Sequence, residues 1–390
     1  MQILDAATEN KRLPLLRLAF RPFFLLGTLF VVIALGRWLG LLSGDLNWSA
    51  SVPHISHILW HGHEMLFGLV MASGGGFLLT AVQNWTGQPG LRGAPLAVLV
   101  LLWLAGRISW WLGLPSVALL LPDLLFIVGA MLALGRSVVA VRQWRNLVFV
   151  PVLSAFTLVH LLMVLSPTLA RGASLAGVWL TVLLIAIVGG RVIPFFTCRR
   201  WNFDKVQEST LELALANLPR VVIALLALFD ALGHPASRVL LAVAALIQLR
   251  RCWRWWDKRN WGESLLWSLH LAYLCLPLAL LIMAAGDASQ AMLAFHLLAI
   301  GTIGGVILAM IARVSLGHTG RSLQAPKLMP LAFVLILAAA LARALLPLLW
   351  PQLTLTGWWL GGGLMISAFA LFVGHYASML MRARADGRPG

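Results

Sequence analysis

Apolar side chains along this chain gather in blocks of about twenty residues, and short polar stretches separate the blocks. An α-helix rises 1.5 Å per residue, so roughly twenty apolar residues cross the hydrocarbon core of a bilayer. The blocks lack the period-two alternation of apolar and polar residues that is typical of a membrane β-barrel. The pattern therefore predicts an all-α polytopic membrane protein.

The number of blocks predicts about twelve transmembrane helices in a single bundle. We expect a membrane domain at 22–381, an N-terminal cytoplasmic segment at 1–21 and a cytoplasmic tail at 382–390. The blocks lie at 22–43, 57–82, 94–114, 117–140, 147–166, 174–197, 211–232, 237–255, 264–286, 288–314, 328–349 and 355–381.

Lys and Arg residues collect in the two end segments and in alternate loops. Positive charge stays on the cytoplasmic side of a membrane, so both termini are expected inside, and this requires an even number of helices. The other loops hold almost none beyond Arg171 and Arg238, whereas the alternate loops and the C-terminal segment hold Arg136, Arg142, Arg145, Arg199, Arg200, Lys205, Arg250, Arg251, Arg254, Lys258, Arg259, Arg321, Lys327, Arg382, Arg384 and Arg388.

Composition supports this interpretation, since 61% of the 390 residues are hydrophobic and 11% are charged. The net charge of +16 is spread between the membrane blocks, which argues for topology signals and against nucleic-acid binding. The three cysteines lack metal-type spacing, and structural disulfides are not expected. No removable signal peptide is expected at the N-terminus.

Histidine is the most informative ionisable residue here. Placing an ionisable side chain inside a membrane costs free energy, so such residues mark functional sites. The densest group opens the second helix and includes His61, His63 and Glu64. At 100° per residue, His57, His61 and Glu64 share one helix face, whereas His63 points nearly opposite His61. A regular helix therefore cannot direct both His61 and His63 to one metal ion.

Other histidines lie within or beside later blocks. His160 and His296 fall in the outer thirds of the fifth and tenth helices, His270 falls in the inner third of the ninth, and His318 is expected in the loop after the tenth. Imidazole is a preferred ligand of haem iron and copper, and histidines at one depth on separate helices suit a metal site inside a bundle. The alternative for each is a hydrogen bond between helices.

Buried arginines and one carboxylate provide a second signal. Arg37, Arg107 and Arg343 fall in the outer halves of their helices. Arg191 and Arg313 lie near inner helix ends. Arginines of this kind are candidates for pairing with haem propionates, and the alternative is that they extend to the lipid headgroups. Glu64 is a candidate proton relay, or else the charge partner of a nearby arginine.

Six ordered segments resemble the signature of the NnrS family of bacterial membrane proteins, and the resemblance covers Phe20 to about Met381. Gln83 stands where many relatives have Pro, which affects the end of the second helix. The segments read FRPFF from Phe20, WHGHEM from Trp60, GFLLTAV from Gly76, NWTG from Asn84, GGRVIPFFT from Gly189 and ARVSLGHTGR from Ala312.

The resemblance implies a bacterial inner-membrane protein of denitrification or nitric oxide stress that binds haem and copper. Because no covalent haem-attachment motif occurs, the haem is expected to be haem b. The metal-ligand candidates carried over are His61, His63, His270, His296 and His318, together with His160.

The leading hypothesis is a haem-dependent protein that binds nitric oxide and consumes it by reduction to nitrous oxide. The required electrons would come from a quinol or a cytochrome. A histidine-lined transporter of metal ions or small solutes is one alternative, and a non-catalytic haem or nitric oxide sensor is another.

Overall fold

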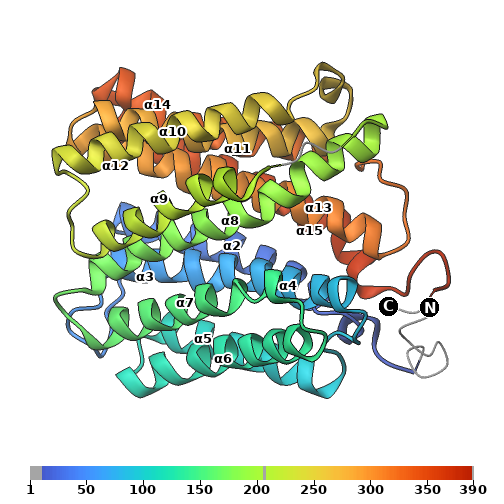
Figure 1. The fold of residues 1–390 in the computed structure, drawn as a ribbon. Helices are drawn as coiled ribbons and strands as arrows, with labels where there is room; N and C mark the ends of the chain where they lie inside the picture. Colours follow the sequence, from blue (N-terminus) through green and yellow to red (C-terminus); the bar gives the residue numbers. More distant parts are fainter. Residues whose placement is uncertain (1–10, 205–207, 389–390) are drawn as a thin grey trace. The chain divides into compact units, whose positions relative to one another are not determined.

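The computed structural model describes residues 11–204 and 208–388, and within these ranges the regular structure is helical and contains no strand. Helices that continue through a change of type are counted as one, which gives twelve long helices in the described part of the chain (Figure 1). The predicted all-α fold is confirmed.

The twelve helices follow the predicted order, with ends that differ from the predicted ends by a few residues. They are α2 (Phe20–Ser43); a continuous helix of α3 (His57–His63), η2 (Glu64–Val70) and α4 (Met71–Thr86); α5 (Ala94–Leu112); α6 (Ser116–Ala140); α7 (Phe149–Leu165); α8 (Ala170–Trp201); α9 (Thr210–Leu228); α10 (Pro235–Trp255); α11 (Ser264–Ala285); a continuous helix of α12 (Ala288–His296), η5 (Leu297–Gly304) and α13 (Gly305–His318); α14 (Met329–Leu349); and α15 (Thr354–Met381).

Eleven of the helices in the described residues are long and apolar enough to cross a membrane. The remaining long helix, α10, carries Arg250, Arg251 and Arg254 in its last two turns, and these residues lower its hydropathy. The chain is therefore a multi-pass membrane protein whose helices face a lipid bilayer.

Local signals in the sequence explain several helix ends. The Ser56 side chain accepts a hydrogen bond from the backbone N–H of Leu59 and so caps the start of α3. Gly87 ends α4 with φ of 67° and Gly113 ends α5 with φ of 63°, a left-handed conformation that favours glycine. His318 is the last residue of α13, so the expectation that it lies in a loop after the tenth helix is wrong.

The chain folds into two compact units. The described residues of unit 1 fall within Met1–Ser174, Ile311–Gln324 and Phe372–Gly390, and unit 2 consists of Leu175–Met310 and Ala325–Leu371. In unit 1, α5 packs on α6, α6 packs on α7 and α2 packs on α4. In unit 2, α10 packs on α11 and α9 packs on α10.

A buried arginine joins distant parts of unit 1. Arg21, at the start of α2, donates hydrogen bonds from Nη1 to the backbone carbonyls of Leu380, at 2.9 Å, and Arg382, at 2.6 Å. The ring of the adjacent Phe20 lies 5.4 Å from the ring of His318. The FRPFF segment therefore holds together the start of α2, the end of α13 and the end of α15.

Two π-helical segments, η2 and η5, interrupt long helices in the described residues, and each begins directly after a histidine. Those histidines are His63 and His296. A Cβ atom on Gly68 of η2 would collide with the ring of Phe30 in α2, and one on Gly301 of η5 would lie 2.7 Å from Sγ of Cys275 in α11. The two glycines allow the neighbouring helices to approach these segments. Short π-helical segments of this kind are often found at functional sites.

Candidate metal centre

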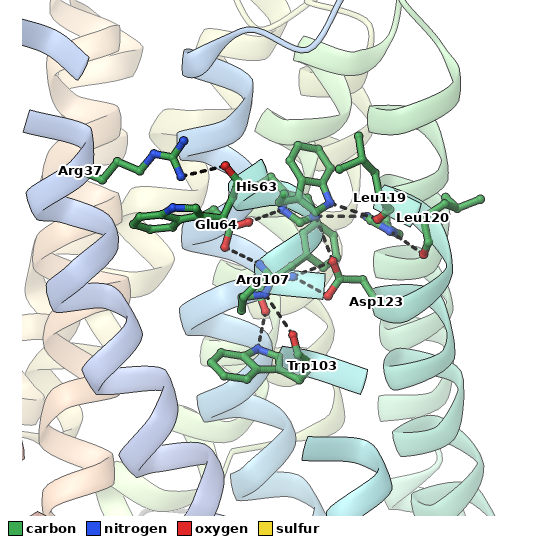
Figure 2. Close-up of polar contacts among 12 residues, drawn as sticks. Arg37, His63, Glu64, Trp103, Arg107, Leu119, Leu120 and Asp123 are labelled. Atoms are coloured by element: carbon green, nitrogen blue, oxygen red, sulfur yellow. Dashed lines mark hydrogen bonds and ion pairs between the residues drawn. The ribbon is translucent and has the colours of Figure 1, made fainter. Parts of the chain in front are cut away.

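Four helices of unit 1 direct ionisable side chains to one buried point. His63 comes from α3, Arg107 from α5, Asp123 from α6 and His160 from α7 (Figure 2). Each lies five to seven residues from an end of its helix, and exposure is 0% for His63, Asp123 and His160 and 3% for Arg107. We call these four residues, together with Glu64, the unit 1 cluster.

Three potential ligand atoms of the cluster converge. One atom from each of His63, Asp123 and His160 lies within 4.8 Å of the other two. Nε2 of His63 lies 3.3 Å from Nδ1 of His160 and 3.5 Å from Oδ2 of Asp123. Ligand atoms at a tetrahedral site with metal–ligand bonds near 2.0–2.1 Å lie about 3.4 Å apart. The observed separations therefore fit one small metal ion.

Each imidazole has a polar partner at the nitrogen that points away from the converging atoms. Nδ1 of His63 lies 3.2 Å from Oε1 of Glu64, and Nε2 of His160 lies 3.2 Å from the carbonyl oxygen of Leu120. The carbonyl of Leu120 only accepts, so Nε2 of His160 carries its ring proton and Nδ1 presents a lone pair. Nε2 of His63 either donates a hydrogen bond to that lone pair or, in the tautomer with its proton on Nδ1, presents a second lone pair to a metal ion.

Arg107 neutralises part of the negative charge in the cluster. Its Nη2 donates to Oδ1 of Asp123 at 2.5 Å and to Oδ2 at 2.6 Å, and its Nη1 donates to Oε2 of Glu64 at 2.5 Å. One guanidinium therefore faces two carboxylates, and with neutral imidazoles the cluster carries one net negative charge. A bound cation would offset that charge inside the membrane, where charge is costly.

Aromatic rings enclose His63. The rings of Trp110 and Phe67 stack on the imidazole at centroid separations of 3.5 Å and 4.6 Å. The Trp110 indole donates to the carbonyl of Leu119 at 3.1 Å, and that of Trp103 donates to the carbonyl of Phe67 in η2 at 3.0 Å. These contacts restrict the orientation of the His63 ring.

A glycine on α5 provides the space that Asp123 occupies. A Cβ atom built on Gly106 would lie 2.6 Å from Oδ1 of Asp123 and 2.8 Å from its Cγ. Since real Cβ atoms are not found this close to a carboxylate, any larger residue at position 106 would displace Asp123 from Arg107. The absence of a side chain at Gly106 is therefore required for the position of Asp123 in the centre.

The other sequence-predicted residues of unit 1 lie outside this centre. The His61 ring stacks on Trp38 of α2 at 4.3 Å, so His61 and His63 contact different helices, as their spacing predicts. Arg37 donates to the carbonyl of Trp111 at 3.0 Å, and its guanidinium lies 4.1 Å from the centre of the Trp111 ring. Arg313 is buried near the end of α13.

Four further candidates belong to unit 2. His296 and Arg343 lie together, with Nη2 of Arg343 3.2 Å from Nε2 of His296. His270 contacts Oγ1 of Thr197 at 3.0 Å through Nε2, which is a hydrogen bond between α11 and α8. Arg191 lies on α8.

The sequence analysis did not single out Asp123 or Arg220. Both are ionisable residues inside apolar blocks, and that position alone marks them as candidates. Arg220 is fully buried in α9 of unit 2. Asp123 completes the donor set that His63 and His160 begin.

Comparisons with known proteins give one clear result. A search of curated proteins finds no match to this chain. The model of the family described as NnrS protein matches residues 14–384, which is nearly the whole sequence. The chain therefore belongs to the NnrS family.

Proposed function

We propose that this protein is a membrane metalloprotein that binds nitric oxide and consumes it. The observation that carries the proposal is the convergence of His63, Asp123 and His160 on one buried point of a membrane-embedded unit. Membership of the NnrS family supports the link to nitric oxide, since the motifs that resemble this family imply a role in denitrification or nitric oxide stress.

The donor set is compatible with copper. Two imidazoles and a carboxylate suit copper, iron and zinc. Copper is proposed among these because the family that the chain belongs to is the one whose resemblance implies copper.

A b-type haem is proposed for unit 2, with His296 as ligand and Arg343 as the partner of a propionate. Nδ1 of His296 donates to the carbonyl of Met292 at 3.0 Å, and the lone pair on Nε2 accepts from Nη2 of Arg343 at 3.2 Å, so binding of haem iron by His296 would require Arg343 to release Nε2. Nη1 of Arg343 is buried and makes no hydrogen bond within the described residues, so it is free to pair with an anion. His61, His270 and His318 remain alternative ligands, and Arg37, Arg107, Arg191 and Arg313 remain alternative propionate partners.

Reduction of two nitric oxide molecules to nitrous oxide and water takes two electrons and two protons. The bound metal and haem would supply the redox chemistry. Oε1 of Glu64 lies 3.2 Å from Nδ1 of His63, and Glu64 is the proposed proton relay toward it. A quinol or cytochrome is the proposed electron donor, and nitric oxide would enter from the lipid bilayer. We place the protein in the bacterial inner membrane, with both termini in the cytoplasm.

A metal-ion transporter is the second candidate. The specific observation in its favour is the single net negative charge around Arg107, Glu64 and Asp123, which would also suit a cation that binds transiently. A transporter would move metal across vesicles and leave nitric oxide unchanged, so the two functions differ in a direct measurement.

The test uses purified full-length protein loaded with copper and haem, kept anaerobic with reductant. We expect a b-type haem spectrum that shifts on addition of nitric oxide, followed by loss of the gas. His63→Ala should abolish consumption, whereas His57→Ala, at an exposed histidine on the same helix, should keep it. A loaded protein that leaves nitric oxide unconsumed would exclude the enzyme.

A further inference from the structure

Unit 2 contains a buried arginine that forms no hydrogen bond with any described residue. Arg220 of α9 is 1% exposed, and its Nε, Nη1 and Nη2 atoms make no hydrogen bond within the described residues. An isolated charge in an apolar interior is strongly destabilising, so a buried guanidinium normally pairs with an anion. The position of Arg220 therefore suits an anionic partner.

Polar side chains of α10 and α11 lie near Arg220. Arg251 and Tyr273 act electrostatically on the Arg220 guanidinium. Nη1 of Arg251 donates to Oη of Tyr273 at 3.0 Å and to Oε1 of Gln248 at 3.2 Å, and the Tyr273 hydroxyl donates to the same Gln248 oxygen at 2.7 Å. We call Arg220, Gln248, Arg251, Trp255 and Tyr273 the arginine cluster.

Glu208, whose carboxylate bonds the arginine cluster within the described ranges, is already paired with Arg251. Oε1 of Glu208 accepts from Nε of Arg251 at 2.8 Å, and Oε2 accepts from Nη2 at 3.1 Å. This ion pair is bidentate and neutral, so the charge of Arg220 remains unbalanced. The arginine cluster together with Glu208 carries one net positive charge.

The arginine cluster also has more hydrogen-bond donors than acceptors. Nε2 of Gln248 and Nε1 of Trp255 are buried and make no hydrogen bond in the described part of the chain. The Trp255 ring lies 4.5 Å from the Arg251 guanidinium and 5.2 Å from the Tyr273 ring. Unused N–H groups beside an unbalanced guanidinium are what an oxyanion requires, because carboxylate and phosphate oxygens accept several hydrogen bonds.

Two consecutive glycines of α8 let its backbone approach the arginine cluster. A Cβ atom on Gly190 would collide with Nη2 of Arg251, and one on Gly189 would lie 3.3 Å from the Tyr273 ring. These glycines begin the GGRVIPFFT segment. Their small size explains how Arg251, Glu208 and Tyr273 fit against α8.

Part of the arginine cluster lies toward one end of its helices. Arg251 is four residues before Trp255, the last residue of α10, and Glu208 precedes the start of α9 at Thr210. Arg220 lies ten residues after the start of α9, so an oxyanion that pairs with Arg220 lies about three helical turns from that end of α9.

We propose that the arginine cluster binds one oxyanion group of the phosphate type, with Arg220 as its charge partner. The phosphate belongs either to an anionic phospholipid or to inorganic phosphate. The site is separate from the residues proposed for nitric oxide chemistry, so either proposal can fail without the other.

The test uses full-length protein, delipidated in neutral detergent, with phosphatidylglycerol, inorganic phosphate or diacylglycerol as probe. We expect phosphatidylglycerol or inorganic phosphate to raise the unfolding temperature by about 4 °C, and diacylglycerol, which lacks phosphate, to have no effect. Native mass spectrometry should show one bound phosphate-containing molecule per chain, and its mass distinguishes lipid from inorganic phosphate.

Two variants complete the test. Arg220→Met removes the charge and should abolish the phosphate-dependent rise, whereas Arg250→Gln, at a more exposed arginine of α10, should keep it. A rise that persists in Arg220→Met would overturn the proposal. Wild-type protein that shows neither a rise nor a bound phosphate would overturn it as well, and this holds even if the Arg220 variant does not fold.

Discussion

Nε2 of His63 lies 3.3 Å from Nδ1 of His160, although 97 residues separate the two histidines in the chain. When the His63 proton is on Nδ1, beside Glu64, both nitrogens direct lone pairs at one point. Two facing lone pairs in a buried site are unfavourable unless a proton or a metal ion lies between them. This relationship, with Asp123 beside it, is the basis of the proposed metal centre.

Gly106→Ala should destabilise the protein and weaken metal binding. The new methyl group would overlap the carboxylate of Asp123, and overpacking of this kind costs about 1–3 kcal/mol. Thermal unfolding in detergent measures the effect. The matched control is Gly36→Ala in α2, where a Cβ atom meets nothing within 4 Å. This substitution should leave the stability unchanged or raise it by up to about 1 kcal/mol. Equal stability of the two variants would contradict the packing described here.

Arg107→Met should be among the most destabilising single changes in unit 1. It leaves Glu64 and Asp123 buried without their charge partner, and breaking a buried ion pair costs about 3–5 kcal/mol. Arg37→Met, which removes a guanidinium that bonds a backbone carbonyl, should cost less. Chemical denaturation of both variants checks the order, and a smaller effect at position 107 would be inconsistent with the ion-pair network.

Glu64→Gln should lower metal affinity while the fold is retained. The amide no longer provides the negative charge that holds Nδ1–H of His63, and loss of an outer hydrogen-bond partner weakens metal binding about 10–100-fold. Competition with a copper chelator measures the change. Glu263→Gln, at the partner of the exposed Arg200, is the control and should bind as wild type does.

Arg21→Met should loosen the C-terminal segment of unit 1. Two backbone carbonyls, of Leu380 and Arg382, would lose their hydrogen-bond donor, at a cost of about 1–3 kcal/mol each if they stay buried. Limited trypsin digestion should then cut after Arg382 faster than in wild type. An unchanged cleavage rate would show that Arg21 does not hold this segment.

The sequence predicted the helices because hydrophobic burial in lipid acts on each block separately. It predicted the number of helices, and most of their ends to within a few residues, including α10 despite its arginines. It did not predict the π-helical segments, since η2 and η5 have the same apolar composition as ordinary helices. It also placed His318 outside the helix that it ends.

The candidate metal centre was only partly predictable. His63 and His160 were among the candidates. The sequence does not predict that they meet, because contact between residues of the second and fifth helices depends on which helix faces pack together. Asp123 has no histidine near it in the sequence, in contrast to Glu64, so no local motif marks it as part of a metal site. The interaction of Arg107 with both acids follows from packing across three helices, which a single sequence does not encode locally.

The most direct test of the central claim is the copper content of purified protein after loading under reducing conditions and removal of free metal. Wild type and His57→Ala should retain about one ion per chain, and His63→Ala and His160→Ala should each retain less than about a tenth of that amount. Full copper retention in both of the latter variants would contradict the assignment of His63 and His160 as ligands.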